Sequence, residues 1–571
     1  MNKKKVIQHL ETIATYLELK GENVFKISAY RKAAQALERD ERSLSEIDKF
    51  SKIKGIGKGT EAVILEFIEK GESETLNQLV EEIPTGLIPL LKLPGLGGKK
   101  LSRLYQELNV IDEKSLKEAL ESGKVEQLPG FGKKTVENLL KALNEFNDRP
   151  ERLPIAYVLP IKEQIELALK NLNEIHSFSI AGSLRRLQET VKDIDFIIAT
   201  TEPEIVADEL VALPFVKEVV AKGSTKVTVI VGGEWDVSVD FRLIEPEQFA
   251  TTLHHFTGSK EHNVEMRRLA KQKGYKISEY GIEHVETEKV HTFESEEQFF
   301  QFFDLPFIPP ELRETGEEVS LKEIPELVDI KHIRGDLHMH STWSDGAQSI
   351  EEMVERCIEK GYEFIAITDH SKFLQVANGL DEKRILEQQE VIIELNEKYP
   401  DITILSGIEM DILPNGELDF SDDFLKNLDF VIASIHSSFN QTEKQIMDRF
   451  RRAFESPYVD MIAHPTGRLI GRRQGYPINY EQFINLAVET NTIIELNANP
   501  NRLDLEWKWL QVAQEKGAKI AINTDAHNFT MLEDMTIGVQ AAKKGWIRKE
   551  TVVNTWSIDD LLRFLKTKKG D

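Results

Sequence analysis

The chain has almost no cysteine and no long apolar run. Cys357 is the single cysteine among 571 residues, so no intramolecular disulfide can form, which fits a reducing compartment. No apolar stretch approaches the roughly 20 residues of a membrane span. The start, Met1 to Val6, lacks the hydrophobic stretch of a signal peptide. We therefore expect a cytoplasmic protein without a membrane partner.

Positive charge is also in deficit, with 72 Lys and Arg against 97 Asp and Glu and a net charge of −25. Averaged over the chain, such a balance argues against nucleic-acid binding. Residues 1–60, however, contain 13 Lys and Arg against 8 Asp and Glu. Because local patches decide DNA binding, and bound metal ions cancel the charge of acidic ligands, the overall acidity does not exclude DNA as a partner.

The length and the changing apolar pattern predict several domains. Apolar positions at spacings of three and four make residues 1–150 helical, β-rich segments follow to about residue 245, and apolar runs alternate with helical stretches from residue 333. That alternation is the cadence of an α/β barrel. The expected divisions are 1–75, 76–150, 151–245, 246–313, a charged linker at 314–332, and 333–571.

Three glycine turns repeat in the helical region, at intervals of 40 and 35 residues (positions 55, 95 and 130). In each, two glycines flank an apolar residue and a lysine follows, so backbone N–H groups at a helix start are available to a phosphate. A single such turn is more often a simple helix breaker, whereas three similar copies favour non-specific DNA binding. The residues expected to contact DNA are Gly55, Gly57 and Lys58, Gly95, Gly97 and Lys99, and Gly130, Gly132 and Lys133.

A first acidic site is predicted in the β-rich region. Asp193 and Asp195 lie two residues apart on a strand and therefore share a face, and Asp240 lies on the polar face of an alternating strand. Carboxylates at this spacing suit Mg²⁺ or Mn²⁺. Gly182 and Ser183 are expected to hold a triphosphate and Arg186 to pair with its charge. The alternative is that Asp193 and Asp195 only decorate an exposed strand, and the residues upstream and downstream argue against it.

A second, polynuclear metal site is predicted in the last 240 residues. Nine potential ligands each follow a short apolar run, and ligands at the ends of successive parallel strands converge at one mouth of a barrel. A lone histidine is more often a core residue, but nine such positions make coincidence remote. Mixed imidazole and carboxylate ligands suit Mn²⁺, Zn²⁺ or Fe²⁺. The nine are His338, His340, Asp345, His370, Glu409, His436, His464, Asp525 and His527.

These motifs together resemble known families. Gly182-Ser183, Asp193, Asp195 and Asp240 resemble the nucleotidyltransferase core of family X DNA polymerases, and the glycine turns resemble helix-hairpin-helix motifs. Residues 333–571 resemble the polymerase and histidinol phosphatase (PHP) domain. In this order the two resemble bacterial and archaeal PolX, a family X polymerase of polymerase β type fused to a PHP domain.

The resemblance implies a multidomain fold: a helical helix-hairpin-helix N-terminal region, an α+β nucleotidyltransferase palm and a C-terminal distorted (β/α)7 barrel. It assigns 246–313 to the nascent base pair and implies a trinuclear site at the nine C-terminal ligands. Lys26 and Tyr30 match residues that hold the 5′-phosphate of a gap. Nucleotide-site positions are filled by Gly182, Ser183, Arg186, Phe256, Gly258, Asn263 and Arg267. Two positions depart from the vertebrate pattern: His255 replaces an aromatic residue that affects sugar discrimination, and Val63 replaces the Schiff-base lysine of the lyase.

The implied function is a DNA-directed DNA polymerase that fills short gaps in DNA repair of the base excision type, with a metal-dependent 3′–5′ exonuclease in the PHP domain. Abasic-site cleavage or 3′-phosphatase activity in the same domain is a further implication. The implied partners are gapped double-stranded DNA with a 5′-phosphate and deoxynucleoside triphosphates, bound by a monomer. Two alternatives stay open: a nuclease or phosphatase whose N-terminal half only delivers DNA, and a non-catalytic DNA-binding scaffold.

Overall fold

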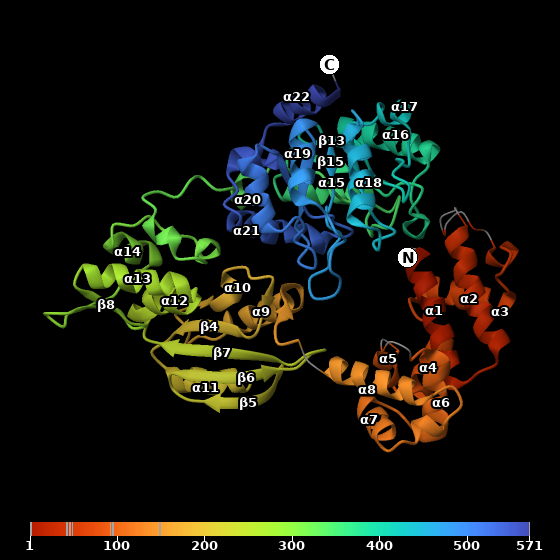
Figure 1. The fold of residues 1–571 in the computed structure, drawn as a ribbon, viewed down its shortest axis with the longest axis horizontal. Helices are drawn as coiled ribbons and strands as arrows, with labels where there is room; N and C mark the ends of the chain where they lie inside the picture. The colour runs from red at the N-terminus through yellow and green to blue at the C-terminus, as the bar shows by residue number, and fades with distance from the viewer. Residues whose placement is uncertain are drawn as a thin grey trace. The chain divides into compact units, whose positions relative to one another are not determined.

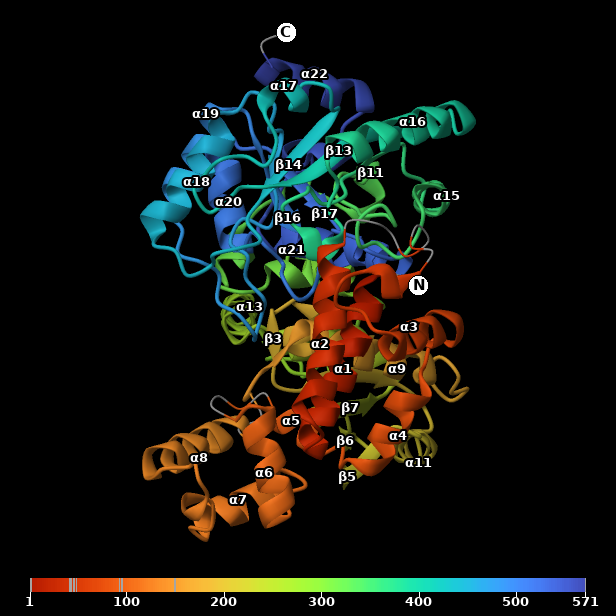
Figure 2. The same ribbon diagram turned by 90° about the vertical axis from the view of Figure 1, so that its right-hand side faces the viewer.

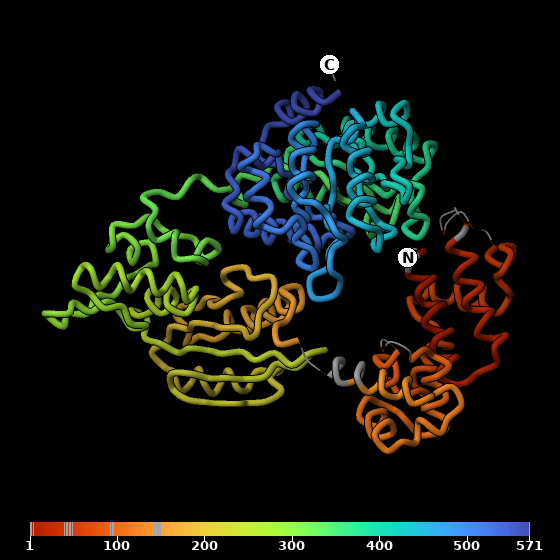
Figure 3. Tube along the Cα trace, viewed as in Figure 1, coloured from red at the N-terminus to blue at the C-terminus, as the bar shows by residue number. Residues whose placement is uncertain are grey.

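The structure is a computed structural model (Figure 1) and describes residues 3–40, 44, 47, 49–91, 93, 96–147 and 150–569. The chain forms two compact units, one of residues 1–150 with 374–379 and the other of residues 151–373 with 380–571. No described helix is long and apolar enough to cross a membrane. Figure 3 follows the path of the chain through both units.

The first unit is helical, as the apolar spacing predicts. Leu10, Ile13 and Leu17 on the first helix are buried, and so are Ala33 and Leu37 on the second, so these helices pack along their apolar faces. One apolar core extends from Val6 to Leu143. The elements are α1 (Lys3–Lys20), α2 (Val24–Arg39), η2 (Phe50–Lys52), α3 (Lys58–Lys70), α4 (Glu74–Glu82), α5 (Leu87–Leu90), α6 (Gly98–Leu108), α7 (Glu113–Glu121), η3 (Val125–Gln127) and α8 (Lys133–Asn147).

The second unit begins with the predicted α+β palm. Its five-stranded sheet has the order β2-β4-β7-β6-β5, in which β4 and β7 are parallel and the other neighbours are antiparallel. β7 alternates buried and part-exposed residues, which leaves Asp240 on its polar face. The elements are β1 (Leu153–Pro154), α9 (Ile155–Leu169), β2 (Ser177–Ile180), α10 (Gly182–Arg185), β3 (Thr190–Val191), β4 (Ile194–Ala199), α11 (Pro203–Val211), β5 (Val216–Lys222), β6 (Lys226–Val231) and β7 (Val237–Ile244).

A smaller helical region with a three-stranded antiparallel sheet follows the palm and has its own aromatic core around Phe299, Phe300 and Phe303. The segment expected to be a linker, 314–332, packs against its neighbours and buries Glu318 and Val328. The elements are η4 (Pro246–Gln248), α12 (Phe249–Thr257), α13 (Lys260–Gln272), β8 (Tyr275–Ile277), β9 (Ile282–His284), β10 (Val290–His291), α14 (Glu296–Phe302), η5 (Pro310–Leu312), η6 (Glu317–Ser320) and η7 (Ile330–His332).

Residues 333–569, all of them described, form the predicted barrel. Seven parallel strands follow in chain order, β11 (Gly335–Asp336), β12 (Phe364–Ile367), β13 (Thr403–Asp411), β14 (Phe430–Ser434), β15 (Met461–Ile462), β16 (Ile493–Asn497) and β17 (Ile520–Asn523). These strands are buried almost throughout, as parallel strands covered on both faces must be. A parallel bridge between Met339 and Ala526 joins the first and last strands, which nearly closes the barrel.

Helices surround these strands, as Figure 2 shows for α15, α16, α18, α19 and α20. They are the crossovers that parallel neighbours require. The helices are α15 (Ile350–Glu359), η8 (Gln375–Ala377), α16 (Glu382–Lys398), α17 (Asp422–Leu425), α18 (Glu443–Glu455), α19 (Tyr480–Glu489), α20 (Trp507–Glu515), η9 (Phe529–Asp534), α21 (Met535–Lys544), η10 (Lys549–Thr551), η11 (Val553–Thr555) and α22 (Ile558–Lys569).

Candidate functional sites

The nine predicted metal ligands lie together at the carboxyl-terminal mouth of the barrel. Glu409 is inside β13, and the other eight follow β11, β12, β14, β15 or β17 in the chain. Among the described residues, three groups have donor atoms within 4.8 Å of one another. They are His340, Asp345, His370 and His527; His338, His340, Glu409 and Asp525; and His370, Glu409 and His436. Each two groups share one residue, as bridging ligands of adjacent ions would.

The Glu409 carboxylate is the centre of this arrangement. Its Oε2 lies 2.9 Å from His370 Nδ1 and 3.3 Å from His338 Nε2. Its Oε1 lies 3.2 Å from His436 Nε2 and 2.9 Å from Nε2 of His464, the ninth predicted ligand. Glu409 is fully buried, and both of its carboxylate oxygens lie close to imidazole nitrogens.

Two aspartates complete the cluster. Asp525 Oδ1 lies 3.1 Å from His340 Nε2 and 3.4 Å from His338 Nε2. Asp345 Oδ1 lies 3.2 Å from His527 Nε2 and 3.6 Å from His370 Nε2. The backbones of His464 (φ 27°) and Asp525 (φ 53°) are in the left-handed region, a conformation that non-glycine residues adopt where the surroundings enforce it.

The donor set fits bound metal ions. Several buried ligand-type atoms have no hydrogen-bond partner within the protein, among them His338 Nε2, His340 Nδ1, Glu409 Oε2 and His464 Nδ1. Leaving such atoms unsatisfied in a protein interior is costly, whereas a cation satisfies them. Imidazole and carboxylate donors in one buried cluster are the ligands of transition-metal ions.

Electrostatics within the cluster are strongly coupled. Burial alone would raise the pKa of Glu409, but His436, His338 and His370 lower it well below its usual range. Burial would lower the pKa of His436, and the Glu409 and Asp411 carboxylates raise it to about 10. The cluster thus keeps the Glu409 carboxylate ionised and favours a proton on His436. Because a ligating imidazole must be neutral, a bound cation would take the place of that proton.

A second layer of residues orients the ligands, and sequence reasoning missed it. Glu495 Oε1 lies 2.7 Å from His338 Nδ1, which directs the Nε2 atom of that ring toward Glu409. Asp411 Oδ2 lies 3.2 Å from His436 Nδ1. Asn497 donates to Asp525 Oδ2 at 3.1 Å. The signal was present in the polar residues inside the buried apolar runs of β13 and β16.

The predicted acidic residues of the palm also converge. Asp195 and Asp240 are direct cross-strand partners on the parallel strands β4 and β7. Burial, and then the neighbouring Asp193 and Asp240 carboxylates, raise the pKa of Asp195 to about 7. Lys226, which sequence reasoning did not assign, lies 2.8 Å from Asp240 Oδ2 and occupies the position of a counter-cation. These three aspartates are not among the tight donor groups found in the described residues.

Glycine is required at the start of α10. Gly182 has φ 62°, and a Cβ atom there would lie 2.3 Å from Asp195 Oδ2. The missing side chain lets the Gly182-Ser183 backbone approach the acidic residues closely. The structure therefore places the predicted triphosphate-binding turn directly beside the predicted metal ligands.

The other predicted nucleotide-site residues lie where the palm meets α12 and α13. Arg186 Nη1 donates to the Thr257 carbonyl, and a Cβ atom at Gly258 (φ 70°) would lie 3.1 Å from that nitrogen. Asn263 donates to the His255 carbonyl at 2.7 Å, and Arg267 Nε donates to the Asn263 carbonyl at 3.0 Å.

Phe256 lies under the guanidinium of Arg242, which is 4.2 Å from the ring centroid and which sequence reasoning did not assign. Both line a cavity of about 230 Å³ beside Glu279 and Tyr280.

In the helical unit, the glycine turns have a common design. The apolar residues Ile56, Leu96 and Phe131 are buried, and the lysines Lys58, Lys99 and Lys133 are exposed. Gly55 and Gly130 have positive φ angles of 116° and 90°. Cβ atoms at Gly57, Gly97, Gly130 and Gly132 would meet no atom within 4 Å, so packing does not demand glycine there. An exposed backbone without side chains suits a phosphate backbone.

Three predicted DNA contacts differ from the others. Gly95 lies outside the described residues. The Lys26 side chain is exposed, and its ammonium pairs with Glu22 at 2.8 Å. Tyr30 is only 8% exposed and belongs to the core of the helical unit.

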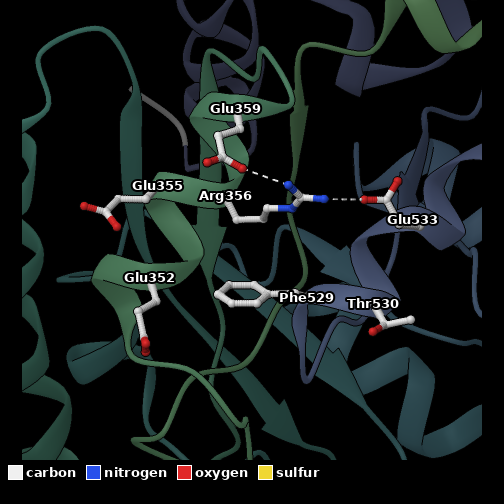
Figure 4. Close-up of a pocket in the computed structure, with 7 residues that line it drawn as sticks. All are labelled: Glu352, Glu355, Arg356, Glu359, Phe529, Thr530 and Glu533. Carbon is white, nitrogen blue, oxygen red and sulfur yellow. Dashed lines mark hydrogen bonds and ion pairs between the residues drawn. The ribbon is translucent and has the colours of Figure 1, made fainter.

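A separate surface pocket lies between α15 and η9 (Figure 4) and has a volume of about 620 Å³. It is lined by Glu352, Glu355, Arg356, Glu359, Phe529, Thr530 and Glu533. Arg356 donates to Glu359 at 2.7 Å and to Glu533 at 3.1 Å, so its charge is satisfied within the pocket. None of the predicted site residues lines it.

Four segments of the chain match known family models. Residues 1–73 match a helix-hairpin-helix domain, and residues 87–145 match a SAM-like helix-hairpin-helix tandem. Residues 252–314 match the DNA polymerase beta thumb, and residues 336–499 match the PHP domain.

Individual relatives cover either the whole chain or part of it. The DNA polymerase/3′-5′ exonuclease PolX of Bacillus subtilis (strain 168) is 57% identical over 567 residues, which are 99% of this chain and 100% of the relative. A probable phosphatase of Thermoanaerobacter sp. (strain X514) is 31% identical over 41% of this chain and 95% of its own. A probable phosphatase of Acetivibrio thermocellus is 30% identical over the same shares.

Proposed function

Because this chain belongs to the bacterial PolX family, and is therefore a DNA polymerase with a 3′–5′ exonuclease, we propose that it fills short gaps during DNA repair of the base excision type. In this proposal the palm extends a primer across the gap and the barrel removes nucleotides from a 3′ end that cannot be extended. The substrates are gapped double-stranded DNA with a 5′-phosphate and deoxynucleoside triphosphates.

The observation that carries the polymerase part is the pairing of Asp195 with Asp240 beside Gly182. Asp193, Asp195 and Asp240 would hold two Mg²⁺ or Mn²⁺ ions, which lower the pKa of a primer 3′-hydroxyl and stabilise a leaving pyrophosphate. Gly182 and Ser183 would bind the triphosphate through backbone and hydroxyl donors, and Arg186 would offset its charge. Phe256, Gly258, Asn263 and Arg267 would line the nascent base pair.

The exonuclease part rests on the shared-ligand cluster in the barrel. The nine residues from His338 to His527 would hold three ions, with Mn²⁺, Zn²⁺ or Fe²⁺ as the candidates, and such ions activate water and polarise a phosphodiester. Glu409 belongs to two of the three groups and would therefore help to hold more than one ion. Glu495 and Asp411 would hold the His338 and His436 rings in their ligating orientation.

Gap binding belongs to the helical unit. The three glycine turns would grip the phosphate backbone without reading sequence, through Gly55, Gly57, Lys58, Gly95, Gly97, Lys99, Gly130, Gly132 and Lys133. Lys26 would bind the 5′-phosphate, and Tyr30 would support the α2 surface from the core. Val63 is buried and has no amine, so this position offers no Schiff-base chemistry.

One assay tests both parts on a single substrate, a gapped, 5′-phosphorylated duplex with a mismatched primer 3′ end. We expect Asp240→Ala to abolish extension and to retain degradation, and His338→Ala to do the reverse. Asp236→Ala and His332→Gln are matched controls outside both sites, and both should behave as the parent chain does. Unchanged extension by Asp240→Ala, or by a double Asp193→Ala and Asp195→Ala variant, would refute the polymerase site.

A second activity of the barrel is the removal of 3′-phosphates, which the similarity to probable phosphatases favours. A primer ending in a 3′-phosphate should be dephosphorylated before it is extended. His338→Ala should block both steps on that primer and leave extension of a 3′-hydroxyl primer intact. Cleavage at abasic sites is tested in the same way with an abasic duplex.

A further inference from the structure

A lysine of the barrel reaches into the proposed nucleotide site of the palm. Lys544, the last residue of α21, is 3% exposed. Its Nζ donates to the Arg186 carbonyl at 2.9 Å and to Glu314 Oε1 at 2.5 Å. Burying an ammonium group is costly unless it is paired, and these two acceptors pair it.

The same Glu314 oxygen is shared with the palm. It accepts a hydrogen bond from Gln188 Nε2 at 2.7 Å and lies 3.4 Å from Arg186 Nε. The distances show that Lys544 is the principal cationic partner of Glu314 and that Arg186 is a weak one. The three charged groups therefore sum to one net positive charge next to the proposed triphosphate position.

We infer that Lys544 is a positioning residue for DNA synthesis, which neutralises Glu314 and so keeps the Arg186 guanidinium available to the incoming deoxynucleoside triphosphate. The inference rests on the proposed triphosphate contact of Arg186. Lys544 acts through Glu314 and the Arg186 carbonyl and does not touch the nucleotide. The barrel thereby contributes to the polymerase site as well as to the exonuclease.

A contrasting pair on the same helix marks this role as specific. The neighbouring Lys543 is 21% exposed in its side chain and pairs with Asp329 at 2.6 Å, away from the palm. Burial lowers the pKa of Lys544, and the Glu314 carboxylate opposes that change, as expected for an ion pair within the interface. Lys543→Met is therefore the matched control for Lys544→Met.

The experiment measures the KM for the nucleotide and kcat on gapped DNA. Without Lys544, Glu314 is left to pair with Arg186, so Lys544→Met should raise the KM about tenfold, the size of one lost charge-assisted contact. Lys544→Met combined with Glu314→Gln restores the net charge and should return the KM to within about twofold of the parent value. Lys543→Met should leave the KM unchanged. Lys544→Arg keeps the positive charge and should therefore keep the KM close to the parent value.

The possible results distinguish a failure of the Lys544 role from a failure of the proposed triphosphate contact of Arg186. If Arg186→Ala leaves the KM unchanged, Arg186 does not bind the triphosphate and both statements fall. If Arg186→Ala raises the KM and Lys544→Met does not, only the role of Lys544 is refuted. A raised KM that Glu314→Gln fails to reverse also refutes it, because a purely structural loss would not respond to charge. Should Lys544→Met not fold, Lys544→Arg and the double variant decide the question.

Discussion

At Gly182 the absence of a side chain lets the proposed triphosphate-binding turn lie close to the acidic residues of the palm. Its φ is 62°, and the nearest atom to a Cβ would be Asp195 Oδ2 at 2.3 Å. Gly123 provides a comparison, because its φ is 71° but nothing lies within 4 Å of its Cβ position. Substitution of Gly123 therefore tests the effect of backbone strain alone, whereas substitution of Gly182 adds a close contact with Asp195.

We expect Gly182→Ala to lower polymerase kcat/KM at least about 100-fold, because a shift of about 1 Å at reacting groups has effects of that size. Exonuclease activity should be kept. Gly123→Ala should cost about 1 kcal/mol of stability through its positive φ and leave both activities intact. Full synthesis by Gly182→Ala would contradict the close approach of α10 to Asp195.

Glu495 is the residue whose role in the metal centre is least visible from the chain alone. We expect Glu495→Gln to weaken metal binding by roughly 10- to 100-fold, as removal of a ligand-orienting carboxylate does. Exposed Glu489→Gln is the control. Metal content after dialysis against graded chelator concentrations measures the effect, and equal retention by both variants would rule out this role.

The convergence of the nine candidate ligands was predictable from the sequence, and the residues that orient them were not. His338 and Asp525 follow short apolar runs, and the carboxyl ends of parallel strands meet at one mouth, so chain order alone brings them together. Glu495 is inside an apolar run, and its contact with His338 depends on strands 157 residues apart. Lys544 looked like an ordinary last-turn lysine, because no pattern in the chain shows which side chains cross a domain boundary.

Among elements, α10 and α14 are joined by a buried ion cluster. Glu296 pairs with Arg313 at 2.6 Å and with Arg185 at 2.6 Å. Burial opposes ionisation of Glu296, but Arg313 and Arg185 prevail and lower its pKa to about 2. The cluster therefore ties the palm to the region after it in a manner that depends on the Glu296 charge.

This depressed pKa predicts a pH dependence of stability. The stabilisation is fully present above the unfolded-state pKa of 4.5 and is lost as the pH falls toward 2. Its size at neutral pH is about 3 kcal/mol from the pKa difference. Glu296→Gln should therefore lower the Tm at pH 7, and the difference from the parent chain should shrink below pH 4.5. A difference that is constant from pH 7 to pH 3 would contradict it.

The helix starts after the glycine turns predict non-specific DNA binding. Because each phosphate contact contributes about 0.9 to the slope of log affinity against log salt, Lys58→Ala with Lys133→Ala should flatten that slope by about two. The loss should be equal for unrelated sequences. Lys114→Ala, exposed on α7, is the control. A sequence-dependent loss would argue against a backbone grip.

At the scale of the molecule, the helical unit, palm and barrel were each predictable from the period of their apolar residues. The palm's contacts with the barrel were not. Arg468, for example, donates to Glu189 of the palm at 2.6 Å and 3.2 Å. Such pairs form between segments 279 residues apart and leave no local pattern.

Metal removal should act on the whole barrel. Ions that bind only the folded barrel stabilise it by mass action, so chelation should lower its Tm and abolish exonuclease activity. Added Mg²⁺ should then restore DNA synthesis. A combined His338→Ala and Asp525→Ala variant, which removes two residues of one ligand group, should show a smaller Tm change on chelation. An equal Tm change in that variant would mean that the stabilising ions bind elsewhere.

The bridge between Met339 and Ala526 brings His338 and His340, which follow the first strand of the barrel, beside Asp525 and His527, which follow the last. An ion held by both pairs would link two segments that are 185 residues apart in the chain, at positions 340 and 525. When the protein is translated, the three palm aspartates leave the ribosome long before Asp525 and His527. On the proposed assignment of these residues, the chain acquires the parts for building DNA first, and its capacity to degrade DNA arises only when the last strand closes the barrel.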